Sequence, residues 1–560
     1  MLACGAEIGG PAWAQVNPAT PPVANLPGAV QPGRDRPLPE IPSQPEFDFR
    51  IEEPDRSPVP RAVDQVRFIL KDIRIVGAKA LPAAGFRKLY EKLLDKEVGL
   101  ADILDVADAI EQAYHDAGYL LVRAYVPPQR VRDGIFTINV TEGHVEHVTV
   151  QGGFPATVDQ VTAYLKDDVG VTPPRVSDIE RGLLLANDLP GVTASGVLRP
   201  ALDVAGASDI VVNIDQPRIT GGVAVDNRGS RFSGLWTLNG DIQINSLLGN
   251  DQLGAVLTTS PDASEQIAGQ LRYRHTVGED GAVAALVVTA GRGQPGSTLA
   301  SFNILTDSWT AGPRLSYPLI RSRAETLALE GGFTVQDAHV NILGARLSHD
   351  QWRVLDLAAT WLRSNWLGGS WSSTLDLAQG LPIFGATPDD SAELSRKGGA
   401  TDFTKVTGSA YYIKPLASGF SAVLTGQGQY SLSPLITGEL ISFGGSQLGR
   451  GYDPGGINGD HGLGGSVELR YDKLLDNAIL LAIEPYGYFD TGRTFYIQRG
   501  AAMDASLTDQ SIASVGGGIR SSLAYNASLG LEVSQTLEAV QGSDGGHRAT
   551  KIFVNASMRY

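Results

Sequence analysis

The residue types most often used in catalysis and metal binding form no recognisable active-site pattern in this chain of 560 residues. The eight histidines are scattered, and His144 and His147 lie three apart in a strand-like segment, which places them on opposite faces. There is no phosphate-cradling loop with a lysine, no GxSxG elbow and no HExxH motif. The single cysteine, Cys4, excludes a disulfide framework and a cysteine-based zinc site. These absences predict a protein that is not an enzyme and needs no cofactor or metal.

One charged residue is distinguished by its surroundings. Residues 440–461 are rich in glycine and carry one central cation, Arg450. Glycine allows the tight turns and close backbone contacts that a loop packed inside a protein needs. The glycines therefore suggest a loop packed inside the protein. The alternative hypothesis is a solvated surface loop whose arginine contacts nothing. Glu484 and Asp490 could suggest paired catalytic carboxylates, but charged residues lining a wet channel explain them better.

In the segments before and after Arg450, apolar and polar residues alternate as they do in the strands of a transmembrane barrel. Beyond Pro217 helical periodicity ends, and residues 236–245 and 552–560 place mainly apolar side chains on one face and mainly polar ones on the other. About sixteen such strands fit between residues 218 and 560, and an even number is expected of a bacterial barrel. No run reaches the roughly 18 apolar residues of a transmembrane helix. The predicted fold is therefore a transmembrane antiparallel β-barrel.

A soluble sandwich or up-and-down barrel would show the same alternation, with its apolar face turned into a core. Two features favour the membrane barrel. The polar faces carry many charged and amide groups, as the wall of a water-filled lumen would. The chain also ends on an aromatic residue, Tyr560, inside its last strand, where outer-membrane barrels carry their assembly signal; Phe553, Met558 and Tyr560 are the candidates.

The region ahead of the barrel has three parts. Residues 1–14, which end in an Ala-x-Ala pattern, are interpreted as the remnant of a signal peptide. Residues 15–65 are Pro-rich and predict an extended linker. Residues 66–143 and 144–216 each show the order β-α-α-β-β, with helices near 82–95 and 100–117 in the first copy and near 157–167 and 176–187 in the second. Two copies in tandem form an internal repeat of small α+β domains.

Short motifs in all these regions resemble one family. Tyr114-x-x-x-Gly118-Tyr119, Val126-Pro127-Pro128-Gln129 and Glu142-Gly143 resemble the first polypeptide-transport-associated (POTRA) domain of TpsB-type two-partner secretion transporters, the haemolysin and haemagglutinin secretion/activation proteins of the BamA-like superfamily. Residues 144–216 resemble their second POTRA domain. In the barrel the resemblance rests on the following segments: Asp226-Asn227-x-Gly229, Phe443-Gly444-Gly445, Arg450-Gly451-Tyr452, Gly459-Asp460-x-Gly462 and Phe489-Asp490-x-Gly492.

The resemblance assigns roles to individual residues. It implies that the extracellular loop at about 440–461 folds back into the lumen and that Arg450 pairs with Asp490 on the barrel wall. The loop motif is then Gly449, Gly451, Tyr452 and Asp460, and Glu484, which shares the strand parity of Asp490, is a candidate second acidic neighbour. For client binding in the POTRA domains it offers the following candidates: Tyr119, Gln129, Glu142 and Gly143.

The resemblance also implies a function and a location. It predicts a transporter in the bacterial outer membrane, with its POTRA domains in the periplasm, that recognises and secretes a large TpsA-type exoprotein such as an adhesin or a cytolysin, with or without activating it. Its other partners would be outer-membrane lipid and, during biogenesis, the barrel assembly machinery. A net charge of −16 argues against nucleic acid as a partner. The alternatives are an outer-membrane protein assembly factor, a passive porin and, least favoured, a secreted hydrolase.

Overall fold

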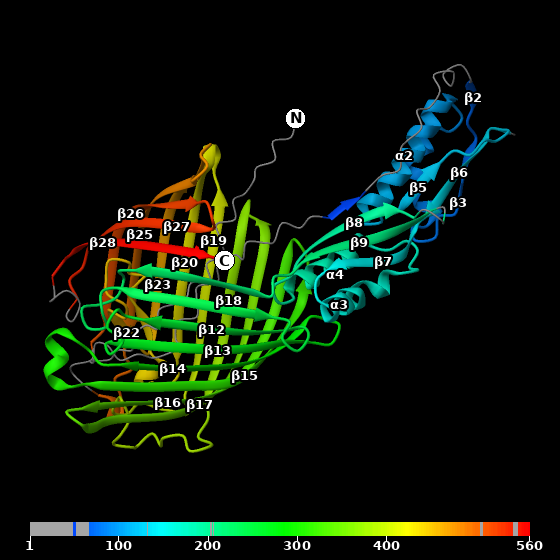
Figure 1. Ribbon diagram of the computed structural model, residues 1–560. Coiled ribbons are helices and arrows are strands. Elements are labelled where there is room, and N and C mark those ends of the chain that lie inside the picture. Colours follow the sequence, from blue (N-terminus) through cyan, green and yellow to red (C-terminus); the bar gives the residue numbers. More distant parts are fainter. Residues whose placement is uncertain are drawn as a thin grey trace. The chain divides into compact units, whose positions relative to one another are not determined.

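The computed structural model describes residues 49–51, 67–131, 133–201, 204, 206–503, 508–540 and 547–560 (Figure 1). The predicted signal-peptide remnant, 1–14, lies outside these residues, as does the predicted linker, 15–65, apart from the short strand β1 (Phe49–Ile51). The remaining chain forms two compact units, which divide between Gln216 and Pro217.

The first half of the N-terminal unit is an α+β domain built around one long helix. Its elements are β2 (Arg67–Ile69), β3 (Asp72–Val76), η2 (Ala83–Phe86), α1 (Arg87–Tyr90), η3 (Glu91–Leu93), β4 (Glu97–Gly99), α2 (Leu100–Asp116), β5 (Val122–Tyr125) and β6 (Ile135–Glu142). The sheet has the order β3-β6-β5. The helix predicted at 82–95 is instead three short turns, and the helical conformation is broken at Tyr90, whose φ is −126°, and ends before Leu94, which is extended.

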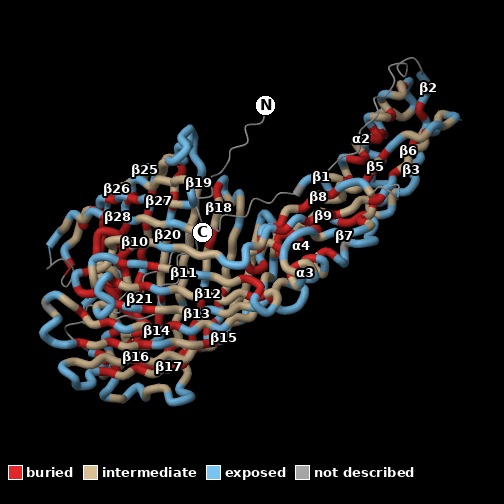
Figure 2. The backbone as a smooth tube through the Cα atoms, viewed as in Figure 1, coloured by how far each residue is buried: buried red, intermediate tan, exposed pale blue. Residues whose placement is uncertain are grey.

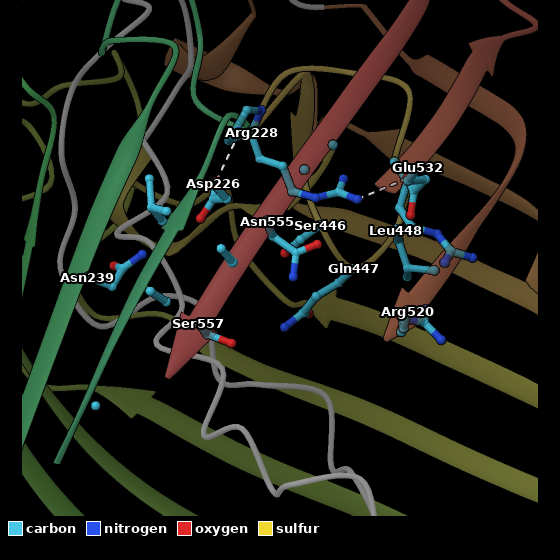
Figure 3. A pocket seen from close by; sticks show the side chains of 18 of the residues that line it. Asp226, Arg228, Asn239, Ser446, Gln447, Leu448, Arg520, Glu532, Asn555 and Ser557 are labelled. Atoms are coloured by element: carbon cyan, nitrogen blue, oxygen red, sulfur yellow. Dashed lines mark hydrogen bonds and ion pairs between the residues drawn. The ribbon is translucent and has the colours of Figure 1, made fainter. Parts of the chain in front are cut away.

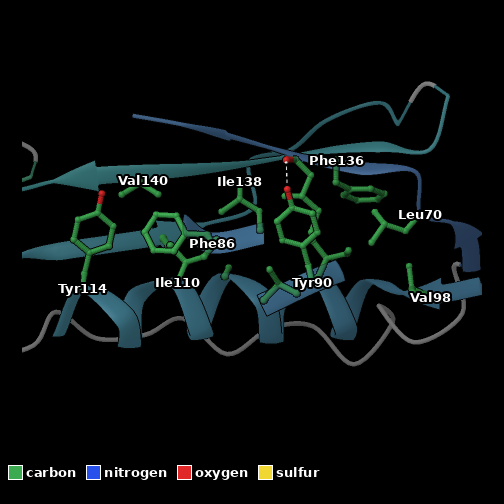
Figure 4. Close-up of a cluster of buried hydrophobic side chains, with 14 of the residues drawn as sticks. Leu70, Phe86, Tyr90, Val98, Ile110, Tyr114, Phe136, Ile138 and Val140 are labelled. Atoms are coloured by element: carbon green, nitrogen blue, oxygen red, sulfur yellow. Dashed lines mark hydrogen bonds between the residues drawn. The ribbon is translucent and has the colours of Figure 1, made fainter. Parts of the chain in front are cut away.

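The core of this domain lies between α2 and the sheet (Figure 4). Ile103, Val106, Ile110 and Tyr114 recur at spacings of three and four, so α2 turns one apolar face toward Phe136 and the other buried residues of β6. The Tyr114 hydroxyl reaches the Glu142 carboxylate at 2.8 Å. Burial and this neighbouring carboxylate both raise the pKa of Tyr114.

The second half of the unit repeats the architecture. Its elements are β7 (His144–Gly152), α3 (Pro155–Leu165), η4 (Lys166–Asp168), α4 (Val176–Asp188), β8 (Thr193–Pro200) and β9 (Ala207–Asp215). The sheet has the order β1-β8-β9-β7, with β1 parallel to β8. A three-residue strand from the predicted linker therefore completes the sheet of the second domain.

The C-terminal unit is a closed antiparallel barrel of sixteen long strands within the described residues. These strands are β10 (Ile219–Asp226), β11 (Thr237–Asn245), β12 (Asp251–Thr259), β13 (Gln266–Val277), β14 (Ala282–Gly293), β15 (Leu305–Arg321), β16 (Glu325–Ile342), β17 (Ala345–Trp366), β18 (Gly369–Gly380), β19 (Thr404–Pro415), β20 (Phe420–Ser431), β23 (His461–Tyr471), β25 (Leu480–Phe495), β26 (Gln510–Leu523), β27 (Ala527–Thr536) and β28 (Thr550–Arg559). The short β24 (Lys473–Leu474) extends one edge of β25, and β10 pairs with β28 to close the ring.

The barrel turns its apolar side chains outward. Along β23, Leu463, Val467 and Leu469 are exposed, whereas Ser466 and Glu468 face the interior and are buried. A similar alternation runs along β25 and β27, and changing colours along the barrel strands are visible in Figure 2. An exposed apolar belt with a charged interior is the pattern of a barrel in lipid. The fold prediction is confirmed, and a soluble sandwich with an inward apolar face is excluded. No helix in the described part of the chain is long and apolar enough to cross a membrane.

Candidate functional site

The loop between β20 and β23 lies inside the barrel. It contains η7 (Thr437–Glu439) and a small hairpin of β21 (Ile441–Phe443) and β22 (Ile457–Gly459). Phe443, Tyr452 and Ile457 form a buried cluster with Ile512 of the barrel wall. Loops at this end of the barrel are long and those at the other end are short, which identifies this end as extracellular. The loop begins near 432, earlier than the predicted 440.

Glycines on the wall make room for the loop. The Phe443 ring rests on Gly462, Gly464 and Gly492, where a Cβ atom would stand 2.8–3.1 Å from ring carbons. Within the loop Gly449 has a φ of +76°, in the left-handed region that glycine adopts without strain. Small wall residues and a glycine-rich loop thus fit one another by shape.

Replacing Gly464 with valine is expected to push Phe443 and Leu448 from their places, because the new Cβ would lie within 3.2 Å of both side chains. Overpacking of this kind costs about 1–3 kcal/mol. The temperature at which the barrel unfolds, followed by its gel mobility shift, should fall. Gly240→Val is the control, since a Cβ at Gly240 meets nothing within 4 Å. Equal unfolding temperatures for the two variants would contradict the packing argument.

Arg450 lies at the centre of an ion cluster between the loop and the wall. Its main-chain N–H and its Nε donate to Asp490 at 3.1 and 3.2 Å, and its guanidinium donates to Glu468 at 2.5 Å and to the Ser466 hydroxyl at 3.1 Å. The guanidinium also stacks 3.3 Å from the centre of the Tyr488 ring. Arg450 is 6% exposed and Asp490 is fully buried. Such multidentate, charge-assisted contacts hold the loop tip in one position.

The second carboxylate on Arg450 is Glu468, not Glu484, and the expectation for Glu484 was wrong. Strand parity predicts which face a residue occupies, but Glu484 lies six residues from Asp490 along β25, or about 20 Å at the rise of a strand. Register places Glu484 opposite Arg520, with which it forms an ion pair. Register likewise places Ser466 opposite Asp490, and Glu468 is the next inward residue of β23.

Two family models match the chain. The one described as "Haemolysin secretion/activation protein ShlB/FhaC/HecB" matches residues 206–521, and the one described as "POTRA domain, ShlB-type" matches residues 68–143. The first match covers more than half of the chain. The chain belongs to the haemolysin secretion/activation protein family. It is an outer-membrane transporter of the two-partner secretion type, whose members secrete partner exoproteins.

Individual relatives agree with this assignment. The transporter is 24% identical to the heme/hemopexin transporter protein HuxB of Haemophilus influenzae (strain 86-028NP) over 80% of each chain. It is 25% identical to the outer membrane transporter CdiB of Escherichia coli over 70% of this chain and 67% of the relative. Among solved structures, CdiB from Escherichia coli has a TM-score of 0.70 at 19% identity, covering 90% of this chain and 93% of that one. BamA from Haemophilus ducreyi lacking POTRA domains 1–3 has a TM-score of 0.51 at 15% identity, covering 88% of this chain and all of that one, which shows a shared fold.

The other residues of the predicted loop motif also join the transporter's loop to its wall. The Gly451 N–H donates to the Ser514 hydroxyl at 3.2 Å, and Ser514 in turn donates to Asp490. The Tyr452 hydroxyl lies 2.9 Å from the carbonyl oxygens of Ala513 and Glu538. Asp490 therefore accepts hydrogen bonds both from the loop and from the neighbouring strand β26.

Asp460 forms a second buried ion pair with Arg396, which sequence reasoning did not find. The two side chains are 2.6 Å apart and at most 3% exposed. Asp460 also accepts the N–H groups of Leu435 and Ile497, at 2.6 and 2.7 Å. Arg396 comes from the long loop after β18, in a segment without a recognisable motif, so no sequence signal connects it with Asp460.

All four client-binding candidates make hydrogen bonds inside the N-terminal unit, and their role in client binding stays a prediction. Gln129 bonds both main-chain groups of Thr137 and so continues the ladder of β6. Glu142 accepts the N–H groups of Lys79 and Ala80. The remaining two lie where the two domains join: Tyr119 accepts a hydrogen bond from Arg175 at 3.3 Å, and Gly143 donates to the Leu121 carbonyl at 2.7 Å.

The last strand places the assembly-signal candidates on different faces. Met558 and Tyr560 point outward and are 50% and 92% exposed, whereas Phe553 is buried against the lumen side. Their role in assembly stays a prediction.

Two histidines that are distant in sequence meet in the barrel. His339 and His349 are register partners on β16 and β17, and His349 contacts Asp337. Within the described residues no group of His, Cys, Asp and Glu is arranged to hold a metal ion.

Proposed function

We propose that the transporter passes one large TpsA-type exoprotein through its barrel and that the loop carrying Arg450 is the element that must move. A single observation supports this: the loop occupies the interior and is tied to the wall by Arg450, Asp490 and Glu468. A polypeptide that crosses the barrel needs the space of the loop. The ion cluster would then define the resting state, in which the loop tip is docked.

The N-terminal domains would receive the exoprotein before it enters the barrel. One sheet ends at the edge strands β3 and β5, and the other ends at β1 and β7. An extended client chain can add to such an edge by main-chain hydrogen bonds, which tolerate many sequences. The β8 edge is the less favourable place, because β1 already pairs with it. The exoprotein would be an adhesin or a cytolysin, in keeping with a family named for haemolysin secretion.

The test is export of the exoprotein encoded beside the transporter. In a strain that lacks the transporter, the exoprotein should disappear from the medium and return when the transporter is supplied. The amounts of unrelated outer-membrane barrels should not change, which separates transport from barrel assembly. Undiminished export without the transporter, or a general loss of outer-membrane proteins, would overturn the proposal.

A further inference from the structure

Positive charges gather on three neighbouring turns at the periplasmic end of the barrel. Residues 321–325, 363–369 and 412–419, where β15 meets β16, β17 meets β18 and β19 meets β20, contain three arginines, one lysine and a single carboxylate. The turn between β13 and β14 carries the opposite charge, with Glu279 and Asp280. In a chain whose net charge is −16, the side of the barrel from β15 to β20 thus presents a positive edge at the periplasmic membrane surface.

Two of these cations, Arg363 and Lys414, point away from the lumen. They share the strand faces of Leu357 and Val406, which are exposed on the outside of the barrel. The Arg363 side chain is 47% exposed and lies 3.9 Å from Glu325, the single carboxylate of the three turns. Lys414 is exposed and forms no ion pair within the described residues. Both cations are therefore accessible to a ligand at the membrane surface.

Four aromatic rings lie beside these cations. Trp366 contacts Trp361, Trp371 and Tyr412, with ring centres 6.2, 5.0 and 6.2 Å apart. The Trp361 ring nitrogen donates to Glu325 at 2.7 Å, so this carboxylate already has a partner. Tryptophan and tyrosine gather at the level of lipid headgroups, because their rings combine an apolar body with a polar edge. Three of the seven tryptophans of the chain meet at this one place, which is more than an evenly spread belt requires.

The turn between β17 and β18 is fixed in its shape. Leu367 and Gly368 have φ values of +51° and +76°, in the left-handed region that leucine rarely adopts. The Tyr412 hydroxyl donates to the carbonyl oxygens of Trp366 and Leu367, at 3.4 and 3.1 Å. Gly369 makes room for the Tyr412 ring, since a Cβ there would lie 2.8 Å from two ring carbons. The rings therefore form a surface that a ligand meets already ordered, which lowers the cost of binding.

Cations inside the barrel are, by contrast, matched by carboxylates. Beside a cavity of about 300 Å³ in the lumen, Arg228 pairs with Glu532 at 2.9 Å, and Arg520 pairs with Glu468 at 3.1 Å (Figure 3). An anion that entered this cavity would find its arginines already paired. The outward cations at the periplasmic end have one weakly placed carboxylate between them, so an anion binds there more favourably.

We infer that this part of the outer barrel surface binds an anionic phosphoglycerolipid of the periplasmic leaflet. Register places Trp371 between Arg363 and Tyr412, and Lys414 is the next outward residue after Tyr412. The headgroup phosphate would lie on the two cations, and the glycerol backbone on the rings. The acyl chains would follow the apolar belt, which begins on β18 at Leu375, 59% exposed. A zwitterionic headgroup would bring its own ammonium against the same cations, so an anionic lipid is preferred. We call this surface the lipid patch; its residues are Trp361, Arg363, Trp366, Trp371, Tyr412 and Lys414.

Native mass spectrometry of the full transporter in detergent tests the lipid patch. Offered palmitoyl-oleoyl phosphatidylglycerol and the corresponding phosphatidylethanolamine in equal amounts, the parent should retain the first about tenfold more. Arg363→Gln and Lys414→Gln should each weaken phosphatidylglycerol binding about fivefold, which is the contribution of one cation near an anionic surface. Arg292→Gln is the matched control, because Arg292 is also an outward cation paired with a carboxylate and is 62% exposed, but it lies at the extracellular end.

Two results would overturn the proposal. The first is equal retention of the two lipids by the parent, and the second is a loss of phosphatidylglycerol from Arg292→Gln as large as that from Arg363→Gln. Glycerol 3-phosphate, added at the concentration of the lipid, should displace none of it. If it did, the patch would bind a phosphate group alone, and its assignment to a lipid would be wrong.

Tryptophan fluorescence locates the bound lipid. Phosphatidylglycerol with brominated acyl chains quenches the tryptophans that it contacts, so at a low ratio of lipid to protein it should quench the parent more than brominated phosphatidylethanolamine does. The difference should shrink in Trp371→Phe and persist in Trp309→Phe, which removes a lipid-facing ring, 43% exposed, from the extracellular half of β15. The reverse outcome would place the lipid elsewhere on the barrel and refute the patch. Neither measurement involves an exoprotein, so both are independent of the proposed route of export.

Discussion

Replacing Arg450 with alanine is expected to leave the barrel inserted in the outer membrane and to abolish export. The substitution removes the cation shared by Asp490 and Glu468, both of which are buried. Removing one partner of a buried pair typically costs about 3–5 kcal/mol. Glu468 keeps Arg470 and Arg520, at 2.6 and 3.1 Å, so the wall stays compensated there. The substitution therefore destabilises mainly the docked position of the loop tip and the buried carboxylate of Asp490.

Two further variants separate the role of Arg450 from a general loss of stability. Arg450→Lys keeps the charge, but an ammonium cannot reach two carboxylates and a hydroxyl while stacking on Tyr488, so export should remain strongly reduced. Arg314→Ala removes another luminal arginine that bridges two carboxylates, Glu330 and Asp356, and export should continue. Exoprotein in the medium and transporter in the outer membrane are measured in the same cultures. Normal export by Arg450→Ala would refute the assigned role of the loop.

The sequence was a good guide to the fold because each prediction rested on a local period. Alternation at period two depends only on which side of a strand faces lipid, so the barrel and its inward charges could be predicted without any contact. The 3.6-residue period likewise located α2, with its bounds wrong by one residue. For the segment 82–95 the prediction of one helix was wrong, because its apolar spacing suits a helix but does not reveal the break at Tyr90 between two short turns.

Local sequence patterns do not show which residues of neighbouring strands lie opposite one another, nor which distant loops contact one another. Glu484 and Glu468 share the inward face, and only the register of β23 against β25 decides which of them reaches Arg450. Arg396 and Asp460 are 64 residues apart, and they come together because their two loops fold against each other. These loops have no repeating pattern from which the contact could be predicted. The strand β1 could not be predicted for another reason. Its three residues lie in a Pro-rich stretch and form a strand only because they pair with the edge of β8.

Replacing Asp460 with asparagine is expected to loosen the extracellular end of the barrel. Asp460 and Arg396 join the loop after β18, the loop carrying Arg450 and the segment after β25, since Arg396 also donates to the carbonyls of Leu435 and Ile497 at 3.1 and 3.3 Å. Beside this pair a hydrophobic cluster inside the barrel combines loop residues such as Leu394 and Leu435 with Trp352 of the wall. Asparagine keeps the shape but leaves the Arg396 cation buried without its counter-ion, at a cost of about 3–5 kcal/mol.

The measurements are the unfolding temperature of the purified barrel and its ion conductance in planar bilayers. Asp460→Asn should lower the first and raise the second, because loops that no longer share an ion pair fill the barrel end less tightly. Asp453→Asn is the matched control in the same loop: its partner Lys551 lies 2.6 Å away, but the side chains are 20% and 18% exposed, so water compensates the loss of this pair better than that of the fully buried Asp460 pair. If both variants behaved alike, burial of the Asp460 pair would not be what holds the three loops together. If Asp460→Asn raised the conductance but left export unchanged, the pair of Asp460 and Arg396 would only keep the pore closed. The role in transport would then belong to Arg450.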